Sequence, residues 1–288
     1  MPASSFPSVA PSFRGRIGHD ARSGYSAVPH RYRLHLARSC PDCLRIAVTH
    51  SLLGLDDTLP IGWLPALPDD GDGGYLALRP LYEASSHRHR GPAAAPVLSD
   101  EWSGRIVSTD SGEILTDLAH RFDRDGANLR PTGSGAAVEA VALLCERGLD
   151  APAQRAGLAG IAPTERETAL RSLLDGLGVI EQRLADRDHL LDEGPTLADV
   201  QVWASLVELD TVHRWHLNAA AVDRVADHPR VWDYARRLAR HPAFGRHLDL
   251  AGIDRRHRAR CRGEEDAGAA MPIVDWARYA RPRAAVSG

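Results

Sequence analysis

The sequence predicts an α/β first part followed by an all-helical second part. Strand-like and helix-like patterns alternate up to about residue 110. From residue 133 onward the periodic stretches have the spacing of amphipathic helices, and no strand candidate of comparable quality follows residue 110. We therefore expect the boundary between the two parts near residues 123–133.

Length and composition limit the classes of function. The chain has 288 residues, 43% of them apolar and 25% charged, which is typical of a globular protein with a sizeable core. The formal charge of −3 argues against a general nucleic-acid binder, because such proteins carry a basic surplus. No apolar run approaches a membrane span, and the first twelve residues lack the pattern of a secretory signal. We expect a cytoplasmic protein with no membrane or nucleic-acid partner.

The first part is expected to contain a small sheet and short helices. Residues 31–36 alternate polar and apolar side chains, the period of a half-buried strand. A helical pattern then runs from Leu44 to Leu53 and is closed by Gly54. The remaining elements are expected to be a strand over 57–63, a loop over 64–74, a helix over 75–85, and a hairpin of strands 95–98 and 105–107 joined by the turn 101–104.

Capping patterns mark the later helices. Asp110, followed three residues later by Glu113, is typical of a helix start. In the second part we expect a capping box at Thr164–Glu167 before a helix to about Leu191, a cap at Thr196–Asp199 before a helix to about Leu217, and a further helix over 229–240.

Cys40 and Cys43 form a Cys-x-x-Cys at the expected junction of strand and helix. The thiolate is the reactive form of cysteine, and the partial positive charge of a helix N-terminus favours it. Cys43 lies one helical turn further on, near enough to close a disulfide. Asp42 acts the other way, because a neighbouring carboxylate disfavours the thiolate. The residues leave open which effect is larger.

Two other interpretations of the cysteines compete with a redox role. A structural zinc site needs four ligands, usually two such pairs; Cys145 and Cys261 are isolated, and the fourteen histidines show no matching spacing. We therefore expect no metal. Two buried, inert cysteines are the other alternative, which the strand–helix junction disfavours. Cys145 is expected in the core and Cys261 is assigned no role.

An ordered set of motifs runs from about residue 12 to 258. They are Ser12-Phe13-Arg14-Gly15-Arg16, Arg31-Tyr32-Arg33-Leu34-His35, Cys40-Pro41-x-x-x-Arg45, Leu78-Arg79-x-Leu81-Tyr82, Ala95-Pro96-Val97-Leu98, Ile106 to Ile114, Pro195 to Val200, and Leu209-Asp210-x-Val212-His213-x-x-His216. In this set the first part resembles the thioredoxin-like domain of glutathione transferases. The whole chain resembles their xi class, the glutathionyl-hydroquinone reductases.

The resemblance implies a fold and a domain plan. The fold is a thioredoxin-like α/β N-terminal domain followed by an all-α C-terminal domain, the glutathione transferase fold. The expected plan is an irregular lead-in over 1–27, a thiol-binding domain over 28–124, a helical domain over 125–254 and a C-terminal extension over 255–288. Transferases of this fold are usually dimers, so a homodimer is expected by analogy.

The resemblance also implies roles for single residues. Cys40 matches the catalytic cysteine. Pro96 matches the cis-proline, whose neighbour Val97 pairs its backbone with the peptide part of glutathione. Asp110 and Ser111 match the pair that holds the γ-glutamyl end. Further candidates are Arg45 for the thiol co-substrate, and His213, His216, Arg256 and His257 for the second substrate.

The chain departs from the family at several of these positions. Asp42 replaces a tryptophan, Cys43 an alanine, His213 a tyrosine and Arg258 another tyrosine. Cys43 adds a candidate resolving thiol, because a second cysteine can attack a mixed disulfide. These changes leave open which small thiol and which electrophile the chain uses.

The expected function follows from the resemblance. It is a thiol-dependent reductase or transferase in which Cys40 removes glutathione, or a similar small thiol, from an aromatic or quinone-type adduct through a mixed disulfide. One alternative is a Cys-x-x-Cys oxidoreductase acting on protein disulfides. Another is a non-catalytic binding module that has kept the fold.

Overall fold

The structure is a computed structural model that describes residues 13–18, 24–87, 89–122, 128–191, 193–261 and 271–280. Part of the lead-in predicted over 1–27 and part of the extension predicted over 255–288 lie outside these ranges. So do Ser12, the first residue of the first motif, and residues 123–127, where the predicted domain boundary falls. The domain boundaries therefore stay predictions.

Four strands form one mixed sheet. They are β1 (Tyr32–Ala37), β2 (Ile61–Leu64), β3 (Val97–Asp100) and β4 (Arg105–Ser108), in the order β2-β1-β3-β4. β1 runs parallel to β2 and antiparallel to β3, and β3 and β4 form an antiparallel hairpin. β1, β2 and β4 therefore all end at the same edge of the sheet, and β3 begins there.

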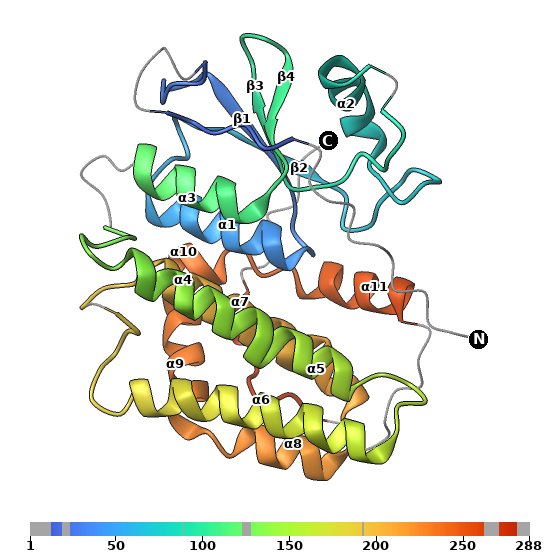
Figure 1. Cartoon of the computed structure of the whole chain (residues 1–288), viewed down its shortest axis with the longest axis vertical. Helices are drawn as coiled ribbons and strands as arrows, with labels where there is room; N and C mark the ends of the chain where they lie inside the picture. Colours follow the sequence, from blue (N-terminus) through green and yellow to red (C-terminus); the bar gives the residue numbers. More distant parts are fainter. Residues whose placement is uncertain are drawn as a thin grey trace.

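Helices α1 (Pro41–Leu52) and α3 (Ser111–Arg121) pack against each other. Figure 1 shows them between the sheet and the helical part of the molecule, whereas the 3-10 helix η2 (Leu76–Leu78) and α2 (Arg79–Ser85) lie on the other side of the sheet. Pro41 at the first helical position begins α1, and Gly54, with φ +63°, follows its end. The ends of α1 are thus fixed by local sequence.

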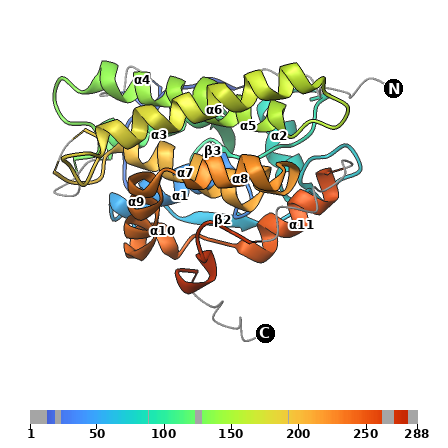
Figure 2. The same ribbon diagram turned by 90° about the horizontal axis from the view of Figure 1, so that it is seen from below.

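The second part consists of helices among the described residues. They are α4 (Gly135–Leu144), the π-helical turn η3 (Cys145–Asp150), α5 (Ala151–Ala156), α6 (Pro163–Arg183), α7 (Leu197–Thr211), the 3-10 turn η4 (His213–His216), α8 (Ala219–Ala226), α9 (Pro229–Arg240), α10 (Pro242–Gly245), α11 (Leu250–Arg260) and the 3-10 turn η5 (Trp276–Arg278). Figure 2 shows α7 within the helical part, with α4, α5 and α6 on one side of it. The predicted α/β first part and all-helical second part are confirmed for the described residues.

α7 is the helix that joins the two parts. Nearly all of its residues are buried, and it packs on α1 of the first part. Its start is the predicted cap: Thr196 and Asp199 form a capping box. Near its end, the Asp210 carboxylate accepts hydrogen bonds from the Ile273 and Val274 amides and from the Trp276 indole. The segment 271–280 is therefore fastened to α7.

Several predicted boundaries are wrong. The capping box at Thr164 is absent, because Pro163 already occupies the first helical position and Ala162 is the N-cap without a side-chain bond. α6 ends at Arg183 rather than near Leu191, and α7 ends at Thr211, where Val212 leaves the helical conformation. The second strand is Ile61–Leu64 rather than 57–63.

The Arg-rich stretch from residue 253 is helical. It continues α11 up to Arg260. Among the described helices, none has the length and apolarity that a membrane span requires.

Candidate active site at the Cys40 edge of the sheet

Three segments meet where β1 ends. Cys40 follows β1 as the N-cap of α1. Val97 pairs with His35 in the antiparallel register of β1 and β3, which places Pro96 beside the end of β1. β4 ends at Ser108 on the same edge, and Asp110 is the N-cap of α3. The topology therefore brings the predicted catalytic cysteine and the predicted thiol-binding residues to one edge of the sheet.

Cys40 and Cys43 differ in access and in charge. Both are reduced; Cys40 is 8% exposed, whereas Cys43 is completely buried. The Cys43 thiol donates a hydrogen bond that lowers the pKa of Cys40 to about 6, against the opposing effect of burial. Burial and the neighbouring Cys40 raise the pKa of Cys43 well above its usual value. The arrangement therefore favours the thiolate at Cys40, the more exposed of the two sulfurs, and the neutral thiol at Cys43.

Arg256 of α11 is the second group that favours the Cys40 thiolate. Its charge and a hydrogen bond to the thiolate lower the pKa of Cys40, and its Nη1 donates to the Ser39 carbonyl at 3.0 Å. The sequence assigned Arg256 to the second substrate. The structure places its guanidinium against Cys40, a residue more than two hundred positions earlier in the chain.

Asp42 opposes the thiolate, as expected from the sequence, but weakly. Its charge raises the pKa of Cys40 less than the Cys43 hydrogen bond and Arg256 lower it. One reason is that its carboxylate accepts a hydrogen bond from Arg45 at 2.9 Å and is 46% exposed to solvent. The pKa of Cys40 is thus lowered overall, chiefly by the hydrogen bond from Cys43.

Arg45 lies between the two parts of the molecule. Besides Asp42, its guanidinium donates to the Asp150 carboxylate at 3.1 Å and to the Ser205 hydroxyl at 3.0 Å, on η3 and α7. These bonds give it a structural role in joining α1 to the helical part. Its predicted role toward the thiol co-substrate stays a prediction.

The predicted glutathione-binding residues have the local geometry that the resemblance implied. The Ala95–Pro96 peptide bond is cis, and Val97 begins β3. Asp110 caps α3 by accepting a hydrogen bond from the Glu113 amide at 2.9 Å, and Ser111 is the first residue of the helix. An N-terminus of this kind is suited to a carboxylate. That these residues bind a thiol co-substrate stays a prediction.

Three residues near this edge were not found from the sequence. Arg14 bridges Asp110 and Glu113, at 3.4 Å and 2.9 Å. Tyr75 lies close enough to Cys40 and Cys43 that their charges add to the burial that raises its pKa to about 12. Burial raises the pKa of Glu208 on α7 to about 7, with Arg256 lowering it and Cys40 raising it further. Arg14 lies in one of the sequence motifs, which could have indicated a role for it. Tyr75 and Glu208 have no such motif, because only tertiary packing brings them to the site.

The predicted second-substrate histidines form a separate group. His213 and His216 lie on η4, and His257 lies on α11, one residue after Arg256. The His216 and His257 rings are 5.0 Å apart, centre to centre. Burial lowers the pKa of His213 to about 4, and the charges of His216 and His257 lower it further. The structure thus brings together residues that the sequence placed in one pocket, although their role toward a substrate stays a prediction.

A surface hollow of about 340 Å³ lies elsewhere, between α4 and the end of α6. Its lining includes Ala137, Gln182 and Leu190 and contains no cysteine or histidine. The chemistry that the side chains offer is concentrated at Cys40 instead.

Comparison with known sequences shows which proteins the chain resembles. Residues 152–237 match the family model of the glutathione S-transferase C-terminal domain. The chain is 28% identical over 253 residues to the glutathionyl-hydroquinone reductase PcpF of Sphingobium chlorophenolicum, covering 82% of this chain and 79% of that protein. It is 24% identical over 256 residues to the glutathionyl-hydroquinone reductase YqjG of Escherichia coli K12, covering 83% and 78%.

Solved structures agree in fold. The xi glutathione S-transferase of Phanerochaete chrysosporium superposes with a TM-score of 0.75 at 21% identity, covering 95% of this chain and 98% of that chain. The glutathione-bound structure of YqjG superposes with a TM-score of 0.73 at 22% identity, covering 85% and 87%.

The sequence comparisons, the fold comparisons and the ordered motifs therefore all indicate a resemblance to the same group of proteins. The similar proteins named above are reductases and transferases, so the expectation that the chain resembles enzymes is confirmed. The chain thus resembles the glutathione transferases, and within them the xi class, the glutathionyl-hydroquinone reductases, whose solved members share its fold.

Proposed function

We propose that this chain is a glutathione-dependent reductase that removes the thiol from glutathionyl adducts of hydroquinones or similar aromatic compounds. The observation that carries the proposal is the Cys40 thiolate, with its pKa lowered to about 6, at the sheet edge where the cis-proline and the start of α3 also lie. The similarity to two glutathionyl-hydroquinone reductases supports the substrate class.

The first step is attack by the Cys40 thiolate on the sulfur of the adduct. A sulfur–sulfur bond forms between Cys40 and glutathione, and the bond between sulfur and the aromatic carbon breaks. The electron pair of that bond stays on the aromatic carbon, which takes up a proton to give the hydroquinone. Near neutral pH Cys40 is largely ionised, so the attacking group is already present as the thiolate.

The second step releases glutathione from the enzyme. A second glutathione thiolate attacks the mixed disulfide, so that glutathione disulfide leaves and Cys40 is free again. Over both steps the adduct is reduced and two glutathione moieties are oxidised to one disulfide. Asp110 and Ser111, at the start of α3, would hold the γ-glutamyl end during these steps, and Val97 would pair with the peptide part.

The experiment is a single-turnover reaction followed by intact-protein mass spectrometry. Wild type mixed with a glutathionyl-hydroquinone and no free thiol should gain one glutathionyl group and release the hydroquinone. The Cys40→Ala variant should do neither, whereas Cys145→Ala, which alters a buried core cysteine, should behave like wild type. Hydroquinone release by Cys40→Ala would overturn the proposal. A panel of small thiols in the multiple-turnover assay then identifies the co-substrate.

A second candidate is a dithiol oxidoreductase acting on protein disulfides, favoured by the hydrogen bond between Cys43 and Cys40. In this scheme Cys43 attacks the mixed disulfide at Cys40, glutathione or a protein thiol leaves, and a Cys40–Cys43 disulfide remains for an external dithiol to reduce. Reduction of a model protein disulfide, together with no activity on glutathionyl adducts, would favour this candidate. No activity on either and no thiol binding would favour a non-catalytic module.

A further inference from the structure

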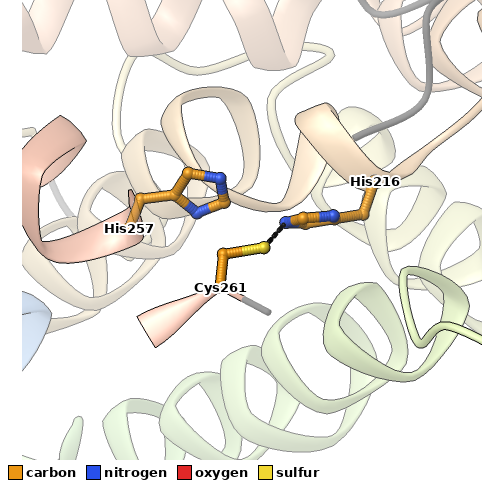
Figure 3. A group of neighbouring side chains, drawn as sticks. All are labelled: His216, His257 and Cys261. Atoms are coloured by element: carbon orange, nitrogen blue, oxygen red, sulfur yellow. Dashed lines mark hydrogen bonds between the residues drawn. The ribbon is translucent and has the colours of Figure 1, made fainter. Parts of the chain in front are cut away.

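His216, His257 and Cys261 form a compact cluster on the helical part. His216 ends η4, whereas His257 lies in the last turn of α11 and Cys261 is the C-cap residue that follows this helix. Figure 3 shows the three side chains pointing toward one another. Their ligand atoms all lie within 4.8 Å of one another, and the Cys261 sulfur is 3.5 Å from Nε2 of His216.

We propose that His216, His257 and Cys261 bind a transition metal ion, with Zn²⁺ as the representative ion. Two imidazoles and one thiolate are ligands that zinc prefers, in a set that leaves one coordination position open for water or another ligand. The proposal does not depend on the proposed reductase function.

The distances fit tetrahedral coordination with little movement. Zinc bonds of the usual lengths hold a nitrogen and a sulfur ligand about 3.6 Å apart. The measured separation of 3.5 Å between the Cys261 sulfur and Nε2 of His216 already matches that value. The longest separation in the cluster, at most 4.8 Å, requires a closure of about 1 Å, which side-chain rotation supplies.

The surrounding chain holds the ligands in place. His257 is buried, and the Cys261 amide donates to the His257 carbonyl at 2.7 Å, which closes the last turn of α11. Gly157 lets the end of α5 approach His216, because a Cβ at that position would lie 2.8 Å from the Cβ of His216. Cys261 and His216 are partly exposed, so an ion has access to the cluster.

Two of the neighbouring arginines on α11 are engaged elsewhere. The Arg258 guanidinium pairs with Asp254 at 2.9 Å, and that of Arg256 contacts Ser39 and Cys40.

With a thiolate and two neutral imidazoles, the cluster neutralises one of the two charges of Zn²⁺.

The test uses the full chain with Cys40→Ser and Cys43→Ser, because a Cys-x-x-Cys can itself bind metal. Co²⁺ is titrated and absorption is recorded. One ion per chain with a thiolate-to-cobalt charge-transfer band is expected, and competition with Zn²⁺ should abolish the band. Adding Cys261→Ser should remove the band, whereas adding Cys145→Ser, at a buried core position, should keep it. Adding His257→Ala should weaken Zn²⁺ binding by at least about tenfold.

A second measurement needs no change at the cluster. In the same Cys40→Ser, Cys43→Ser chain, alkylation of Cys261 is followed by peptide mass mapping with and without Zn²⁺. Zn²⁺ should slow the alkylation of Cys261 at least about tenfold, because a coordinated thiolate is withheld from the reagent. Equal alkylation rates, or a cobalt band that survives Cys261→Ser, overturns the metal site. Neither result bears on the reductase function, because no glutathione or adduct is present.

Discussion

The two sulfur clusters of this chain differ in the partners of the sulfur. At Cys40 the partners are a second thiol and a guanidinium, which donate hydrogen bonds to the sulfur and favour its thiolate form. At Cys261 the neighbours are two imidazoles: Nε2 of His216 is hydrogen-bonded to the sulfur at 3.5 Å, and the ligand atoms of all three side chains lie within 4.8 Å of one another. The first environment favours a nucleophile and the second favours a shared cation. The two environments therefore suit different chemistry: a nucleophilic thiolate at Cys40 and a metal ligand at Cys261.

The largest effect is expected from removing the sulfur of the first cluster. Cys40→Ser should lower kcat/KM for a glutathionyl-hydroquinone by about 10³-fold or more, because a serine hydroxyl is not ionised at neutral pH. Steady-state hydroquinone release measures the loss, with Cys145→Ser as the control because that side chain is buried in the core. Activity within tenfold of wild type would remove Cys40 from the nucleophile role.

Removing the hydrogen-bond donor should have the next largest effect. In wild type, the rate of Cys40 alkylation should rise with pH around a midpoint near 6, since the thiolate forms as pH increases through its pKa. In Cys43→Ala that midpoint should move upward by about two pH units, because the thiolate loses its hydrogen bond from the second thiol. Rapid alkylation by iodoacetamide across pH 5–9 measures the shift. An unchanged midpoint would show that Cys43 does not stabilise the thiolate.

The first cluster was largely predictable because it is local in sequence. Cys40 and Cys43 lie one helical turn apart, and Pro41 fixes the helix start beside them. The Asp110 cap was found in the same way. The second cluster was missed because its members come from η4 and α11, and only the packing of those elements brings Cys261 to His216. No spacing in the sequence indicates such a contact.

Two arginines to which the sequence analysis gave substrate roles also show that contacts made by tertiary packing are hidden in the sequence. Arg45 shares a helix with Cys40, yet its charge is used in bonds to Asp150 and Ser205 of the helical part. Arg256, far away in the sequence, is the arginine that contacts Cys40. Proximity along the chain therefore does not indicate which arginine contacts Cys40, because tertiary partners decide the direction of each side chain. Likewise, the Thr164 capping pattern was overruled by a proline one residue earlier.

Replacing Arg256 should produce a smaller shift in the same direction. Arg256→Met should raise the midpoint of Cys40 alkylation by about one pH unit, because one nearby positive charge and its hydrogen bond are lost while the Cys43 donor remains. Arg258→Met is the matched control, since Arg258 lies on the same helix but pairs with Asp254. Equal midpoints in the two variants would show that Arg256 acts on the structure of α11 rather than on the charge of Cys40.

The smallest effect, and the one of opposite sign, is expected at Asp42. The negative charge of its carboxylate raises the pKa of Cys40 and so disfavours the thiolate. Asp42→Asn should therefore lower the alkylation midpoint, by about half a pH unit or less because the carboxylate is half-exposed and paired with Arg45. The same pH series measures it, and raising the salt concentration in wild type should shrink the difference between the two proteins. An upward shift would mean that Asp42 acts mainly by holding Arg45, so that the electrostatics of the first cluster extend into the helical part.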